Sequence, residues 1–343
     1  MPGFPHIRES NTALHASALA VKTRRREGYN PIVCSADNLR YRWDEPNFPT
    51  ATSRFEFSHC ARTPLPWIEE LEKAAVSLAE STTKPIWICS SGGVDSETLC
   101  EIFLRLNLPF NVLTIEFADG KNAHDVVYAK RWCQQNQVRQ ELYALDIFDF
   151  VKSELDNYID DGYVAGELFR YMMLKELSIV ESMGGLAVLA GGEQLYEVDA
   201  SKKVLTAADP YLKLDISYTT PLEWCRRNHV QHEPFFYFST PEIMLAWLRI
   251  PLVKFVLNHP DFFRHPTNKY ALKNSVVRYH FPQQQWRNKY TGFEQVLNLA
   301  GMVQARLESH FGARIQKSRL YVSELLKQLA PPQQSQPDME RSL

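Results

Sequence analysis

The stretch Ser90-Ser91-Gly92-Gly93-Val94-Asp95-Ser96 constrains this chain more than any other part of its sequence. It follows a short apolar run, residues 86–89, that predicts a buried strand, and it opens an apolar periodicity that predicts a helix from about Ser96. Paired glycines let the backbone turn tightly, while serine hydroxyls and the N–H groups of a helix N-terminus donate hydrogen bonds to anions. The arrangement therefore predicts a pyrophosphate-binding turn between a strand and a helix.

Within this turn each residue type has an expected role. We expect Ser91, Gly92, Gly93 and Ser96 to surround the phosphates. Asp95 is expected to hold Mg²⁺, because magnesium is commonly shared between one or two carboxylates and phosphate oxygens. The spacing matches neither Gly-x4-Gly-Lys-Ser/Thr nor Gly-x-Gly-x-x-Gly, which argues against ordinary kinases, GTPases and dinucleotide oxidoreductases. The alternative is a Ser/Gly turn without any ligand.

Strand-like and helical patterns alternate around this turn. Helical periodicity occurs near residues 67–78, 99–106, 123–135 and 147–182, and buried strands are predicted at 86–89, 110–117, 141–145 and 186–190. This alternation predicts an α/β fold with a parallel sheet. Ligands of such sheets bind beyond the carboxyl ends of the strands, where a second turn, Gly191-Gly192-Glu193, also lies. Glu193 is then a candidate second metal ligand or a general base, and a carboxylate at a helix start is the alternative.

The remaining segments define the domain organisation. Residues 1–63 lack sustained periodicity apart from a strand-like piece at 54–57, and they predict an irregular N-terminal extension. A single domain is expected over 64–329, followed by a disordered tail, 330–343, with little apolar content. The later part of the domain is expected to be mainly helical, with helices near residues 239–258, 269–279, 291–310 and 314–328.

Composition excludes several classes of protein. The formal net charge of −2 argues against a generally basic nucleic-acid binder, although residues 22–26 form a local basic cluster. Six cysteines without a Cys-x-x-Cys pair favour reduced thiols in the cytoplasm. Residues 1–11 lack the apolar core of a signal peptide. The most apolar region, 243–257, is interrupted by two basic residues and a proline, so no contact with a membrane is expected.

The motifs carry a resemblance to a known family. The string Ser91 to Ser96 resembles the PP-loop of the ATP pyrophosphatases, which cleave ATP between its α- and β-phosphates. Residues 67–96 look like the opening of the synthetase domain of asparagine synthetase. Residues 189–197 are similar to its second motif, Ser-Gly-Glu-Gly-x-Asp-Glu, although Gln194 and Leu195 stand where acids are expected. Three late segments follow the family's order: residues 249–253, 268–273 and 287–293.

The resemblance spans about residues 64–312 and extends to relatives that close β-lactams or peptide macrolactams. It implies a PP-loop ATP pyrophosphatase core and an amide ligase that forms AMP and pyrophosphate from ATP and Mg²⁺, joining a small carboxylate to ammonia or an amine. In the family a late lysine faces the phosphates, which implies Lys289 here, with Lys269 and Arg287 as neighbouring catalytic candidates.

Glutamine-using members carry a glutaminase domain. This chain has Pro2 and a short extension, which implies nitrogen from outside, for instance from a separate ammonia-supplying protein.

The adenine is expected against the second strand of the sheet, next to the phosphate turn, where Leu113 and Glu116 lie. Together with Gly191 and Gly192 they complete the expected nucleotide-binding set. Two alternatives stay open at this point. One is a PP-loop enzyme that modifies a nucleobase or RNA by thiolation or deazaguanine chemistry, which usually needs paired cysteines. The other is a degenerate nucleotide-binding protein without turnover.

Overall fold

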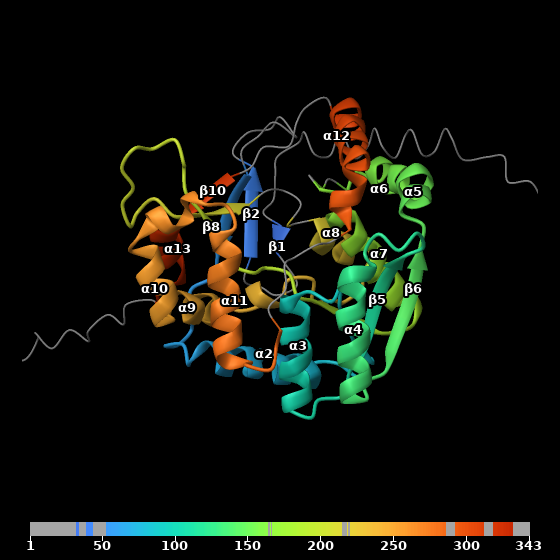
Figure 1. Cartoon of the computed structure of the whole chain (residues 1–343), viewed down its shortest axis with the longest axis horizontal. Helices are drawn as coiled ribbons and strands as arrows, with labels where there is room; N and C mark the ends of the chain where they lie inside the picture. Colours follow the sequence, from blue (N-terminus) through green and yellow to red (C-terminus); the bar gives the residue numbers. More distant parts are fainter. Residues whose placement is uncertain are drawn as a thin grey trace, which may run out of the picture.

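Four parallel strands form the central sheet of the computed structural model (Figure 1). The structure describes residues 32–33, 39–43, 53–163, 165, 167–214, 218, 220–285, 292–311 and 318–331. The order across the sheet is β6-β5-β4-β7, with bounds β4 (Ile86–Cys89), β5 (Asn111–Phe117), β6 (Gln140–Leu145) and β7 (Leu186–Leu189). The prediction of an α/β fold with a parallel sheet is therefore confirmed.

The strands β4, β5 and β7 are largely buried, as expected for a parallel sheet covered by helices. All four residues of β4 and all four of β7 are buried, and Val112 and Leu113 of β5 are fully shielded from solvent. In register, Cys89 at the end of β4 lies beside Leu113 on one side and Leu189 on the other. The carboxyl ends of β4 and β7 consequently lie side by side.

Helices cover both faces of this sheet. The helices α3 (Val94–Arg105) and α4 (Ala123–Asn136) connect β4 to β5 and β5 to β6, and they lie side by side in front of the sheet (Figure 1). The chain then reverses direction across the sheet, and α7 (Leu168–Ser182) packs against β5 and β7. Because this crossover to β7 is right-handed and runs in the opposite direction across the sheet, α7 lies on the face opposite to α3 and α4. Before α7 come α5 (Ile147–Asp149), the π-helix η1 (Phe150–Glu154) and α6 (Leu155–Asp160).

Two small antiparallel sheets lie outside the central sheet, and one of their strands coincides with the strand-like piece predicted at 54–57. One has the order β10-β9-β8, with bounds β8 (Tyr196–Glu197), β9 (Tyr211–Leu214) and β10 (Ser318–Tyr321). The other contains β1 (Ile32–Val33), β2 (Leu39–Trp43) and β3 (Ser53–Phe57). The expectation of an irregular extension over 1–63 is thus wrong for these strands, apart from the strand-like piece at 54–57. It fails because the strands are only two to five residues long, too short to show sustained periodicity.

The segment around β3 is hydrogen-bonded to residues 328–329 of the last described helix. The backbone N–H of Phe57 donates to the side chain of Gln328 at 2.9 Å, and the N–H of Cys60 donates to the carbonyl of Leu329 at 3.1 Å. The Phe57 ring packs edge-on against Phe238, with 5.2 Å between ring centres. These contacts make the end of the expected extension part of the main hydrophobic core.

The C-terminal half is mainly helical, as predicted, with different boundaries. Pro251 divides the expected helix over 239–258 into α9 and α10, since a proline is favoured at the first position of a new helix. The helix expected over 314–328 begins later because residues 318–321 form β10. Among the described helices, none combines the length and apolar character needed to cross a membrane. The remaining helices are α2 (Trp67–Glu80), α8 (Thr220–Asn228), η3 (Phe236–Phe238), α9 (Pro241–Arg249), α10 (Pro251–Leu257), η4 (Pro260–Arg264), α11 (Asn268–His280), η5 (Phe293–Val296), α12 (Leu297–Phe311) and α13 (Val322–Leu329).

Candidate functional site

The strand order places a crevice at the carboxyl ends of β4 and β7. From β4 the chain moves to β5 and β6 on one side, and it later returns to β7 on the other side. Ligands of open α/β sheets bind where the direction reverses in this way. Both glycine-containing turns identified in the sequence, residues 90–93 and 190–193, leave the sheet at this point.

The conformation of the first turn depends on Gly92. Its φ is +84°, and a Cβ atom added there would lie 2.0 Å from the carbonyl oxygen of Asp125 in the first turn of α4. Gly93 has a φ of −74°, and an added Cβ would meet only the Ser91 hydroxyl, at 3.4 Å. The missing side chain of Gly92 is therefore needed for the close approach of α4, and Gly93 tolerates a methyl group.

The serines of the turn differ in their surroundings. The hydroxyl of buried Ser90 donates to the Ser96 hydroxyl at 3.1 Å, and Ser96 donates in turn to the carbonyl of Gly93 at 3.1 Å. The backbone N–H of Ser90 donates to Leu113 of β5 at 2.8 Å. Ser91 is exposed. The turn is therefore held from inside by Ser90 and Ser96, and Ser91 is the hydroxyl that faces solvent.

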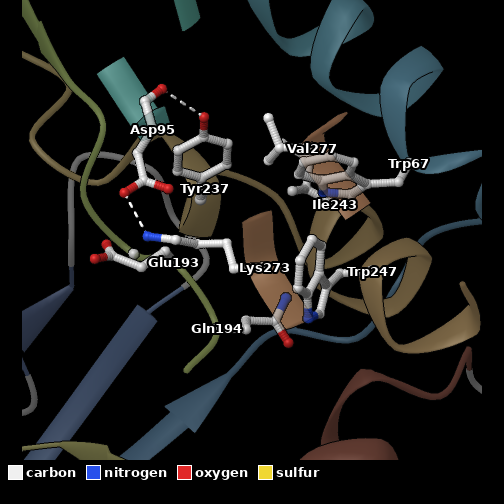
Figure 2. Close-up of a pocket in the computed structure, with 10 residues that line it drawn as sticks. Trp67, Asp95, Glu193, Gln194, Tyr237, Ile243, Trp247, Lys273 and Val277 are labelled. Carbon is white, nitrogen blue, oxygen red and sulfur yellow. Dashed lines mark hydrogen bonds and ion pairs between the residues drawn. The ribbon is translucent and has the colours of Figure 1, made fainter. Parts of the chain in front are cut away.

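Asp95 forms an ion pair that the sequence did not predict. The Nζ atom of Lys273, on α11, lies 2.6 Å from Oδ2 of Asp95, with the two side chains 7% and 15% exposed (Figure 2). The Tyr237 hydroxyl donates to the backbone carbonyl of Asp95 at 2.9 Å. Burial, and next the charges of Asp95 and Glu193, raise the pKa of Tyr237 well above its ordinary value, so its hydroxyl is a neutral donor.

The second turn is packed against the segment that follows α8. A Cβ on Gly191 would lie 2.5 Å from the carbonyl oxygen of Pro234, and one on Gly192, whose φ is +87°, would lie 2.7 Å from the Phe238 ring. The N–H of Tyr237 donates to the carbonyl of Gly191 at 3.1 Å. These glycines thus let residues 234–238 lie directly on the turn.

The second turn and Asp95, which follows the first turn, border one pocket. Figure 2 shows Glu193 on the same side of it as the Asp95–Lys273 pair, with two tryptophans on the other side. Among the described residues no group of three or more His, Cys, Asp or Glu side chains is placed to hold a metal ion. The lining residues are Trp67, Asp95, Gly192, Glu193, Gln194, Tyr237, Ile243, Trp247, Lys273 and Val277.

The other expected site residues lie elsewhere. Lys269 forms an ion pair with Glu197 of β8, and Lys213 approaches the same carboxylate at 3.5 Å. Burial opposes the charge of Glu197, but hydrogen bonds and charges from the two lysines leave its pKa lowered. Glu116 pairs with Lys130 of α4 at 2.8 Å. The structure therefore does not bring Lys269 or Glu116 to the Asp95 pair.

Two further expectations concern the second strand and the late motif. Leu113 is fully buried, and its carbonyl already accepts the hydrogen bond from Ser90. Arg287 and Lys289, the main catalytic candidates of the late motif, lie outside the described residues. Their roles stay predictions.

Comparisons with known proteins give a coarse result. No family model matches this chain, and no curated protein matches it. Solved structures with a similar arrangement include the NH3-dependent NAD synthetase from Campylobacter jejuni in complex with the nitrate ion, at 14% identity and a TM-score of 0.33, covering 74% of this chain and 99% of that chain. NMN synthetase from Francisella tularensis has 9% identity and a TM-score of 0.32, covering 73% of this chain and 96% of that one. The U34-tRNA thiolase NcsA from Methanococcus maripaludis has 12% identity and a TM-score of 0.29, covering 65% and 81%. Similarity at this level assigns no family.

Lys273 and Tyr237 are the site residues that sequence reasoning missed. Lys273 follows Lys269 by one helical turn, so both lie on one face of α11, and this spacing was the available signal. Nothing local distinguishes which of the two lysines meets α3. Tyr237 lies in an aromatic run, residues 235–238, that has no motif character.

Proposed function

We propose that this chain is an ATP-dependent amide ligase that forms AMP and pyrophosphate, using Mg²⁺, a small carboxylate and ammonia or an amine. The observation that carries the proposal is the convergence of Asp95 and Glu193, from the ends of β4 and β7, with Lys273 on one pocket at the reversal point of the sheet. Two carboxylates and a cation at such a point are suited to a metal-bound polyphosphate.

The N-terminus of α3 supports the placement of the phosphates. Its N-cap residue is Gly93, which has no side chain to accept hydrogen bonds from the first-turn N–H groups. Those groups and the helix dipole favour an anion in front of the helix. Pyrophosphate bound there lies next to Asp95 in the first turn of the same helix.

Asp95 and Glu193 fit magnesium because both supply the hard oxygen ligands that this ion takes, and water and phosphate oxygens complete its coordination. When bound, the ion neutralises charge on the phosphates. Lys273 neutralises Asp95 in the present structure. If a metal ion held the charge of Asp95, the Lys273 ammonium would be free to pair with phosphate oxygens, a role that the family resemblance implies for Lys289.

In the proposed reaction a carboxylate oxygen of the substrate attacks the α-phosphorus of ATP, the bond to the bridging oxygen breaks, and pyrophosphate leaves. The nitrogen of ammonia or an amine then attacks the acyl carbon, and AMP leaves with the electron pair of the broken bond. The proton lost by nitrogen requires a base. Glu193 lines the pocket beside the Asp95 pair, and as the alternative to its role as a second metal ligand it is suited to act as this base.

The cysteines argue against sulfur transfer. Cys60, Cys89, Cys100, Cys133 and Cys225 are all buried and free of disulfides. Burial is the main cause that raises the pKa of each thiol, to about 12 for Cys60, Cys133 and Cys225. A persulfide carrier needs an accessible thiolate, and none of these five described thiols offers one.

The test is ATP–pyrophosphate exchange across a panel of carboxylates, with identification of AMP or ADP as product. Carboxylate-dependent exchange and AMP are expected. Asp95→Asn should lower exchange by roughly 10²-fold or more while circular dichroism shows an unchanged fold, since it removes a charge that acts on the phosphates. Exchange that requires RNA or a free base, nucleotide binding without turnover, or ADP as the only product would each refute the ligase.

A further inference from the structure

Arg170 is buried, and none of the described carboxylates pairs with its charge. It is 7% exposed and is the third residue of α7. Its Nη1 lies 3.3 Å from the sulfur of Met173, and its Nε has no hydrogen-bond partner. Within the described part of the chain, no carboxylate lies at ion-pair distance from this guanidinium. An arginine is rarely buried in this way unless it is paired.

The position of Arg170 in its helix adds to the cost. A positive charge in the first turn of a helix is opposed by the helix dipole. Aromatic rings compensate in part, because the guanidinium carbon lies 4.2 Å from the ring centre of Tyr218 and 4.5 Å from that of Phe169. Rings cannot satisfy the N–H groups of a guanidinium as an oxygen anion does. An anion bound to the guanidinium would offset both unfavourable contributions.

Arg170 lies close to the candidate active site. Helix α7 leads through a short turn into β7 and packs against it, so the two run antiparallel. The N-terminus of α7 is consequently at the carboxyl end of β7. The guanidinium is 5.6 Å from the ring centre of Phe235, and the same ring would lie 2.7 Å from a Cβ on Gly191. One aromatic ring thus separates Arg170 from the second turn.

We propose that Arg170 is a specificity-determining residue that binds a second carboxylate of the small-molecule substrate, distinct from the carboxylate that is adenylated. This inference rests on the proposed function. A planar guanidinium whose faces contact aromatic rings donates hydrogen bonds through its edge, and a planar carboxylate can accept two parallel hydrogen bonds from that edge. The substrate class is accordingly a carboxylic acid with a second anionic group, and monocarboxylates lack the contact.

The experiment compares succinate with propionate, which differ by one carboxylate, in the full chain and in Arg170→Met and Arg170→Lys. Binding of succinate is measured by calorimetry without ATP, and exchange is measured with each acid. We expect wild type to bind succinate, Arg170→Met to lose roughly tenfold or more in affinity, and Arg170→Lys to lie between them. Without any anion, Arg170→Met should melt no lower than wild type, because it removes an uncompensated buried charge.

The outcomes separate this inference from the ligase proposal. Arg170-dependent binding of succinate without any exchange supports the site and refutes the ligase. Exchange that prefers succinate no more than propionate, or a preference unchanged in Arg170→Met, overturns the site and leaves the ligase standing. Wild type that binds inorganic phosphate and ignores succinate also overturns it. An Arg170→Met variant that melts well below wild type, with its succinate affinity unchanged, assigns Arg170 a structural role.

Discussion

Removing Lys273 tests the central arrangement most directly. Its ammonium lies 2.6 Å from Asp95, and both side chains are largely buried. Removing one partner of a buried pair leaves an uncompensated charge and costs about 3 kcal/mol at the lower end of the usual range. For 343 residues the entropy of unfolding is about 0.7 kcal/mol/K. Lys273→Met should therefore melt about 4 °C below wild type, a shift measurable by differential scanning fluorimetry.

Magnesium should reverse part of this loss. In Lys273→Met the Asp95 carboxylate is free to take a divalent ion, whereas in wild type the ammonium competes for it. An excess of Mg²⁺ at 100 times its dissociation constant would return about 2.7 kcal/mol. We expect Mg²⁺ without nucleotide to raise the melting temperature of Lys273→Met by a few degrees more than that of wild type.

Two controls make the measurement specific. Lys269→Met removes a lysine one turn away on the same helix, which pairs with Glu197 instead, and it should show no additional response to Mg²⁺. Asp95→Asn should be destabilised and should not respond either, because the metal ligand is gone. The reasoning is refuted if Lys273→Met has the same melting temperature as wild type. It is also refuted if Mg²⁺ raises the melting temperatures of wild type and the three variants equally.

Other substitutions give further predictions. Gly92→Ala should cost more than about 3 kcal/mol or prevent folding, because it combines a positive φ with a backbone clash, while Gly93→Ala should stay within about 1 kcal/mol by urea titration. Burial raises the pKa of Glu233 to about 7 from 4.5, so its protonated form is favoured in the folded state and stability is lost as pH rises through this window. Glu233→Gln should therefore match wild type near pH 4 and exceed it by about 3 kcal/mol at pH 8, and equal stability at pH 8 contradicts the assignment. Lys269→Met should lose stability through its broken pair with Glu197 yet keep exchange activity, and a loss of exchange as large as in Lys273→Met would return Lys269 to the site.

The sequence predicts the central sheet because its strands are local signals. Residues 86–89 and 186–189 are continuous apolar runs between helical periodicities, which is how strands buried on both faces read. The small sheet of β8, β9 and β10 has no such signal. β9 pairs with β10 across more than a hundred residues, as in Tyr211 opposite Tyr321, and no local pattern in either strand specifies the other. The helix that the sequence predicts over 314–328 therefore includes residues 318–321, which form β10.

The candidate site follows the same rule: its local motifs were predictable, and its long-range contacts were not. The strand-turn-helix string located Asp95, and the second turn located Glu193, because both are read within a few residues of a strand end. The lysine that pairs with Asp95 was not predictable in this way. Whether Lys269 or Lys273 reaches Asp95 depends on how α11 crosses α3, and that crossing is set by packing between segments 178 residues apart.

The glycines indicate which part of the site is already formed before any ligand binds. Gly92 is required by the backbone of α4, and Gly191 and Gly192 are required by residues 234–238, so neither turn can change shape without moving an entire packed segment. Lys273 is different, since its long, flexible side chain is held at Asp95 by one ion pair, and a metal ion that neutralised Asp95 would offset the cost of breaking that pair. Binding of a metal-bound polyphosphate therefore demands movement of one side chain between two fixed turns. Such a small rearrangement is expected of a preorganised site that stabilises charged transition states.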